Sequence, residues 1–117
     1  MNNKPKYHIF KNTKYALEGL FHALKTESSF RLELLCAIFI VAGIFYIDTS
    51  VTNKLILLVT GILVLIIELV NSAIENTVDL VTKEHHNLAK NAKDIGSTAV
   101  MFSIILHTVC WIVILFN

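Results

Sequence analysis

Three carboxylates follow an apolar run in the middle of the chain, within the segment E-L-V-N-S-A-I-E-N-T-V-D at residues 68–79. Glu68 and Glu75 are seven residues apart and Glu75 and Asp79 are four apart, so on a helix all three share one stripe about 16 Å long. Asn71 lies beside this stripe. An acidic side chain at the end of a membrane-like segment is costly unless it faces water, a metal or a partner. The stripe therefore indicates a bound cation and a reaction rather than packing, although Asp79 alone would fit a solvated helix face equally well.

A second polar group follows, with the adjacent histidines His85 and His86 and then Lys93 and Asp94. Lys93 has the charge to bind a phosphate, although it and Asp94 fit the start of a helix equally well. Adjacent histidines point to different faces of a helix and lack chelating spacing, which favours hydrogen bonding over metal binding. The lone His107 in the last apolar run is expected to have an interhelical hydrogen-bond partner.

The composition is typical of a membrane protein. The 117 residues are 55% hydrophobic and 16% charged, with a mean hydropathy of +0.64. So short a chain cannot bury this much apolar surface in a core of its own, so lipid or other subunits must cover it. A net charge of +1 without interleaved basic and aromatic residues argues against a nucleic-acid partner. The glycine-rich phosphate-binding motifs are absent, so a nucleotide would have to be held by lysines and carboxylate-bound Mg²⁺.

The apolar pattern predicts one all-α membrane domain over residues 1–117, with an amphipathic surface helix and three spanning helices. The basic polar face of the first segment favours a helix on an anionic membrane surface, with a short soluble helix as the alternative. Asn53 or Thr52 is the expected cap of the second spanning helix. Small residues at 96–99 allow close helix packing in the third. The expected ranges are 6–27 for the surface helix and 30–47, 54–83 and 93–116 for the spanning helices.

The basic residues predict the orientation in the membrane. Nine of the ten lie in the N-terminal region or at 83–93, and only Lys54 lies in the turn between the first two spans. The positive-inside rule therefore places the N-terminus and the 83–93 loop in the cytoplasm, with a multi-pass chain in the inner membrane. Glu27, Glu75 and Lys93 then gather at the cytoplasmic interface.

Three segments closely resemble the prokaryotic diacylglycerol kinases. They are E-L-V-N-S-A-I-E-N-T-V-D at residues 68–79, T-E-S-S-F-R-L-E at 26–33, and H-x-L-A-x-x-A-K-D-I-G-S-x-A-V at 86–100. Their order and spacing match the family, and the resemblance extends over nearly the whole chain. It implies a homotrimeric helical bundle with a surface helix and three spanning helices per subunit. It also implies an enzyme that uses ATP and Mg²⁺ to phosphorylate a membrane lipid alcohol.

The resemblance further implies roles for individual residues. Glu68 would be the catalytic base on the lipid hydroxyl, with Asn71 and Asp79 also in the catalytic site. Glu27 and Glu75 would hold the metal and, through it, the nucleotide. The other residues implied around the nucleotide are Tyr15, Glu84, His85, His86, Lys93 and Asp94, and those around the lipid substrate are Phe30, Arg31, Ser97 and Glu68 itself.

The chain departs from the family pattern at three positions. His8 stands where the Gram-negative enzymes usually have an arginine near the ATP, and Ala16 and Glu18 replace the usual serine and lysine near the lipid. The sequence V-D-L-V-T resembles the undecaprenol kinases of Gram-positive bacteria, whereas G-S-T-A-V resembles the diacylglycerol branch. Diacylglycerol, which would give phosphatidic acid, is the favoured substrate, and undecaprenol is the alternative.

A small oligomeric ion or proton transporter, with Glu68 as the relay, is the alternative from another class. The remaining polar groups cluster on one side of the membrane, and residues 48–54 and 109–116 at the opposite end offer almost no exit path. A purely structural membrane subunit would leave the acidic stripe unexplained. Because lipid cannot solvate Glu68 and one chain supplies only three spans, we expect neighbouring subunits to share each active site.

Overall fold

The computed structural model describes residues 8–117, and the described range is helical, without strands. The helices are α1 (Ile9–Thr26), α2 (Ser28–Tyr46), α3 (Val51–Val81) and α4 (Asn87–Phe116). Each of α2, α3 and α4 is long and apolar enough to cross a membrane. The predicted all-α class with three spanning helices is therefore confirmed, while the homotrimer stays a prediction.

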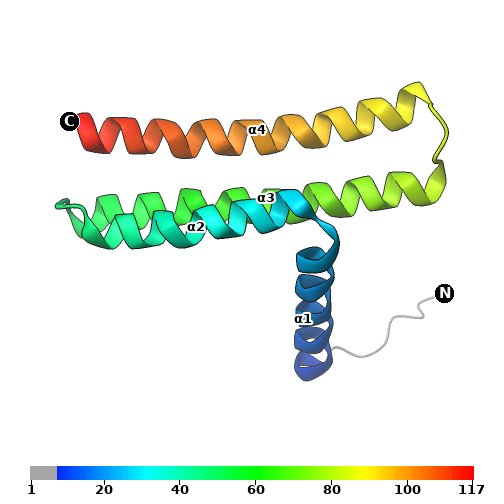
Figure 1. Cartoon of the computed structure of the whole chain (residues 1–117), viewed down its shortest axis with the longest axis horizontal. Coiled ribbons are helices and arrows are strands. Elements are labelled where there is room, and N and C mark those ends of the chain that lie inside the picture. The colour runs from blue at the N-terminus through cyan, green and yellow to red at the C-terminus, as the bar shows by residue number, and fades with distance from the viewer. Residues whose placement is uncertain (1–7) are drawn as a thin grey trace.

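The three spanning helices run antiparallel to their neighbours in the chain, and α1 stands at a steep angle to them (Figure 1). Helix α3 packs most extensively against α4, less against α2, and α1 packs against α2. This is an open arrangement around α3 rather than a closed bundle. The steep angle of α1 is the orientation that a helix on the membrane surface needs relative to helices that cross it.

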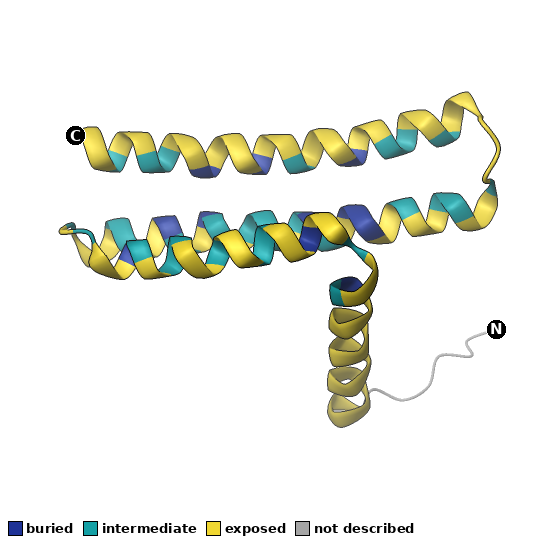
Figure 2. Cartoon of the chain, in the orientation of Figure 1, coloured by how far each residue is buried: buried dark blue, intermediate teal, exposed yellow. Residues whose placement is uncertain are grey.

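A single chain buries few of its apolar side chains. The buried hydrophobic residues among those described are Ala23, Phe30, Ile44 and Leu57. Figure 2 shows the buried positions of α4 on the side that faces α3, with most of the remaining surface exposed. Large aliphatic and aromatic residues make up much of that exposed surface on the spanning helices. Lipid or further subunits must cover it.

Helix α3 begins with a different cap from the one predicted. Ser50 precedes the helix, and its Oγ accepts a hydrogen bond from the backbone N–H of Asn53 at 3.1 Å. The Asn53 side chain instead donates to Thr49 Oγ1 at 2.9 Å. The prediction that Asn53 or Thr52 caps the helix was therefore wrong. Serine at this position satisfies an N–H group that has no partner inside the helix.

Helix α4 begins at Asn87 rather than at residue 93. His86 caps it, because its Nδ1 accepts a hydrogen bond from the backbone N–H of Leu88 at 3.1 Å. Within the early turns of α4, Lys90 Nζ lies 2.6 Å from Asp94 Oδ2. The charged stretch that was expected to be a loop is therefore the polar end of a helix that extends beyond its apolar part.

A chain of hydrogen bonds joins α3 and α4 between their apolar faces. Trp111 Nε1–H donates to His107 Nε2 at 3.0 Å, and His107 Nδ1 lies 2.8 Å from Thr60 Oγ1. Because Nε2 accepts, a neutral His107 carries its proton on Nδ1 and donates it to Thr60, whose hydroxyl can donate to Ile56 O at 2.8 Å. Gly61 leaves space for the ring, since a Cβ there would lie 3.2 Å from it. The predicted interhelical partner of His107 is confirmed.

Candidate active site

Glu68 is buried on α3 and faces further carboxyl groups. Glu33 on α2 lies within hydrogen-bonding reach of it, and the charges of Glu27 and Glu75 act on it from nearby. Glu33 Oε2 is buried and has no hydrogen-bond donor among the described residues. A proton held between the two carboxyl groups would supply that bond. Sequence spacing alone does not assign Glu33 to the site, because the packing of α2 against α3 brings it to Glu68.

Asn71 lies one turn after Glu68, and it is also buried. Its Nδ2 donates to Glu75 Oε1 at 3.1 Å, along the same face of α3. Such i, i+4 pairs are neighbours on a helix surface. Asn71 therefore links the buried part of the acidic stripe to its more exposed part, where Glu75 is half-buried.

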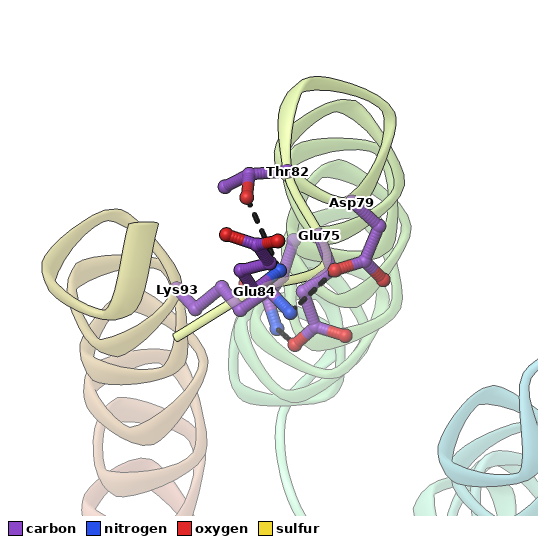
Figure 3. A network of polar contacts seen from close by, with 6 residues as sticks. Glu75, Asp79, Thr82, Glu84 and Lys93 are labelled. Carbon is purple, nitrogen blue, oxygen red and sulfur yellow. Dashed lines mark hydrogen bonds and ion pairs between the residues drawn. The ribbon is translucent and has the colours of Figure 1, made fainter. Parts of the chain in front are cut away.

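Lys93 reaches from α4 to α3 and donates from Nζ to Asp79 Oδ1 at 2.6 Å (Figure 3). Glu75 lies one turn before Asp79, and its charge also acts on Lys93. The side chains of Lys93 and Asp79 are 40% and 44% exposed, so a ligand from solvent can reach the pair. The structure thus brings together the far end of the acidic stripe and the lysine that the sequence placed near a phosphate.

The connection between α3 and α4 borders a hollow of about 350 Å³ beside this pair. Thr82 shapes the connection, since its Oγ1 accepts a hydrogen bond from the backbone N–H of Glu84 at 3.1 Å (Figure 3). Tyr15 does not line the hollow; it is exposed on α1, which packs against α2. Five residues expected around the nucleotide do line it, and they are Glu84, His85, His86, Lys93 and Asp94.

The residues expected around the lipid are spread over three helices in one chain, with Phe30 and Arg31 on α2, Glu68 on α3 and Ser97 on α4. Phe30 is buried in the first turn of α2, and Ser97 is exposed on α4. Arg31 donates from Nη1 to the backbone oxygens of Leu24 and Lys25 at 2.9 and 3.0 Å, and so caps carbonyl groups at the C-terminal end of α1. An apolar groove of about 620 Å³ runs between α2, α3 and α4, with Glu33 among its lining residues.

The carboxylates fit a magnesium site only when further ligands join them. Among residues 8–117, no group of three histidine, cysteine, aspartate or glutamate side chains is placed to hold a metal ion. Glu27 and Glu75 both lie near Glu68 and offer the hard oxygen atoms that Mg²⁺ prefers. Mg²⁺ commonly takes one or two carboxylates and completes its shell with phosphate oxygens and water. The oxygen chemistry and the number of these two carboxylates therefore suit a magnesium–nucleotide site.

Known proteins resemble this chain over most of its length. The sequence profile of the prokaryotic diacylglycerol kinase family matches residues 14–115. The diacylglycerol kinase of Pseudomonas aeruginosa is 40% identical over 107 residues, which cover 92% of this chain and 87% of that protein. Those of Haemophilus influenzae and Escherichia coli are each 35% identical over 109 residues, which cover 93% of this chain and 92% and 89% of those proteins.

The spanning helices, the buried acidic stripe and these similarities define a small bacterial membrane protein of the lipid kinase class. More particularly, the chain belongs to the prokaryotic diacylglycerol kinase family. The resemblance seen in the sequence is thereby confirmed.

Proposed function

We propose that this protein transfers the γ-phosphoryl group of ATP to the free hydroxyl of diacylglycerol, giving phosphatidic acid and ADP. The observation that carries the proposal is the buried Glu68, with Glu33 against it and the Lys93–Asp79 pair farther along α3. In the proposal, Glu68 is the proton acceptor at the apolar end of a polar tract, and Lys93 is the phosphate-binding cation at its solvent end. The relatives named above are all called diacylglycerol kinases, which supports diacylglycerol over undecaprenol.

In this reaction Glu68 accepts the hydroxyl proton as the lipid oxygen attacks the γ-phosphorus. Its burial excludes water that would otherwise compete for the phosphoryl group. Glu33 lies close enough to share the proton, so that two carboxylates need not be charged side by side. The apolar groove that reaches Glu33 suits the acyl chains of a lipid whose hydroxyl lies at its polar end.

On the nucleotide side, Lys93 would donate to phosphate oxygens while Asp79 holds its ammonium group in place. The hollow beside it, walled by Glu84, His85 and His86, would take the rest of the nucleotide. Glu27 and Glu75 are the side chains that would hold Mg²⁺, which when bound neutralises phosphate charge. Phosphoryl transfer requires mainly positioning and charge neutralisation, and these residues supply both.

The proposal includes a homotrimer with active sites shared between subunits. The open arrangement around α3 and the exposed apolar surface of the spanning helices support an assembly. Tyr15 lies away from the hollow of its own chain, which supports a contribution to the site of a neighbour. Burying those helix faces against other subunits would also enclose the groove next to Glu68.

The proposed location is the inner membrane, with the N-terminus and the active site in the cytoplasm. Support comes from the basic residues, nine of ten of which lie in the N-terminal region or at 83–93 in the sequence. ATP is available on the same side. A membrane-impermeant label that modified a cysteine introduced at position 85 only from the outside would contradict this orientation.

The test of the proposed function is a phosphorylation assay on the purified protein. Radiolabelled ATP, Mg²⁺ and either diacylglycerol or undecaprenol in mixed micelles are incubated with it, and products are separated by chromatography. Labelled phosphatidic acid as the dominant product supports the proposal. Preferential labelling of undecaprenol would correct the substrate, and failure to label either lipid would count against kinase activity.

A further inference from the structure

Gly96 lies buried on the face of α4 that packs against α3, directly opposite Asn71. A Cβ at this position would lie 2.1 Å from Asn71 Oδ1 and 3.2 Å from Asn71 Cγ. Side-chain atoms do not approach each other so closely, so Asn71 can keep its present orientation only opposite a glycine.

The orientation of Asn71 is in turn fixed by Glu75. Nδ2 of Asn71 donates to Glu75 Oε1 at 3.1 Å, and turning the amide over would place Oδ1 against that carboxylate. Oδ1 consequently faces Gly96, where it is buried and has no hydrogen-bond donor among the described residues. A buried carbonyl oxygen without a donor costs free energy. The hydrogen bond from Asn71 Nδ2 to Glu75 must therefore offset the cost of leaving Asn71 Oδ1 unpaired.

From this geometry we infer that Gly96 is a positioning residue for the metal–nucleotide site. By leaving space for Asn71, it keeps the Asn71 amide on Glu75 and so holds the Glu75 carboxylate in one orientation. The inference rests on the proposed function, in which Glu75 is a ligand for the metal. Residues that orient a metal ligand typically change metal affinity or activity by roughly 10- to 100-fold when they are lost.

The substitution Gly96→Ala separates this role from a role in helix packing. The atom that a methyl group would meet most closely is the end of the Asn71 side chain, which can rotate away without moving either backbone. Alanine also has a higher helix propensity than glycine. We therefore expect a folded protein in which Asn71 no longer bonds Glu75.

Binding of Mn²⁺ with a non-hydrolysable ATP analogue, followed by electron paramagnetic resonance on the full-length protein in micelles, measures the effect without turnover. We expect Gly96→Ala to weaken Mn²⁺–nucleotide binding roughly tenfold or more. Gly43→Ala is the matched control, since a Cβ at Gly43 meets nothing within 4 Å among the described residues. It should bind as the wild type does. Equal affinity for Gly96→Ala and wild type would overturn the inference.

A double-mutant cycle tests the route through Asn71. Asn71→Ala alone should weaken binding, and adding Gly96→Ala to it should cause no further loss, because the clash has gone. An equal loss from Gly96→Ala in both backgrounds would show that the methyl group acts through helix packing, which contradicts the inference.

Glu75→Gln separates the positioning role of Gly96 from the proposed metal role of Glu75. If Glu75→Gln weakens Mn²⁺ binding while Gly96→Ala does not, only the positioning role of Gly96 is wrong. If Glu75→Gln has no effect, Glu75 does not hold the metal, and the inference about Gly96 is wrong with it.

Discussion

Lys93 Nζ lies 2.6 Å from Asp79 Oδ1 and so connects the first part of α4 to the last part of α3. Both side chains are partly exposed, so the pair is open to a ligand and is screened by solvent. A contact of this kind is better suited to orienting the Lys93 ammonium group toward a phosphate than to stabilising the fold.

Asp79→Asn should therefore weaken nucleotide binding with little effect on stability. Lys93 keeps its charge but loses the charged partner that orients it, so we expect the KM for ATP to rise roughly tenfold. Steady-state kinetics and a thermal melt on the same preparation measure the two effects. Asp48→Asn, at the opposite end of the spanning helices, is the matched control and should change neither. A lower melting temperature with an unchanged KM would make the pair purely structural.

Glu27→Gln and Glu75→Gln should each raise the Mg²⁺ concentration needed for half-maximal activity. Each substitution replaces a charged oxygen ligand by a neutral one, and excess Mg²⁺ should restore part of the lost rate. Activity measured over a range of Mg²⁺ concentrations at saturating ATP gives the result. If both variants keep the wild-type magnesium dependence at reduced rate, then neither residue holds the ion.

His107→Ala should destabilise the protein without changing its substrate. The substitution removes the acceptor for Trp111 Nε1–H and the donor to Thr60, and interhelical hydrogen bonds in membranes average about 0.6 kcal/mol each. A total loss near 1 kcal/mol, measured by unfolding in detergent, is expected. Thr108→Ala is the control, because the hydrogen bond of Thr108 within residues 8–117 stays in its own helix, to Ile104 O. Equal losses of unfolding free energy in the two variants would mean that the interhelical contacts of His107 do not stabilise the protein.

The fold was largely predictable because lipid imposes a simple rule on sequence. Long apolar runs must be helices when no water can pair their backbone groups, and α2, α3 and α4 follow that rule. The rule does not apply outside the apolar region, which is why the start of α4 at Asn87 was missed. There the helix depends on the His86 cap rather than on apolar periodicity.

The site was predictable only along single helices. The stripe from Glu68 to Asp79 follows from helical spacing, whereas the approach of Glu33 to Glu68 depends on how α2 packs against α3. Small residues at 96–99 predicted close helix packing, but only Gly96 faces α3, since the other three are exposed. Which of four neighbouring small residues forms the contact is set by the rotation of α4, and sequence spacing does not specify that rotation.

Shared active sites predict complementation between chains that are each impaired at a different residue. When Glu68→Gln and Glu27→Gln chains are mixed during refolding, some sites in mixed oligomers receive the wild-type residue from each chain. At a Mg²⁺ concentration too low to restore Glu27→Gln, part of the wild-type activity should then return, whereas each variant refolded alone keeps only its low residual activity. Self-contained sites would give no recovery at any mixing ratio, and the shared-site proposal would be abandoned.

In the proposed reaction, Glu68 accepts the proton of the lipid hydroxyl. Glu68→Gln keeps the size of the side chain and its capacity to hydrogen bond Glu33, but it removes the base. The most direct measurement compares the rate of phosphatidic acid formation with the affinity for Mg²⁺–ATP in wild type and Glu68→Gln. General-base catalysis commonly contributes about 10²- to 10⁴-fold, so turnover should fall by that amount while nucleotide affinity stays within about twofold. Near-normal turnover in Glu68→Gln would show that Glu68 is not the base.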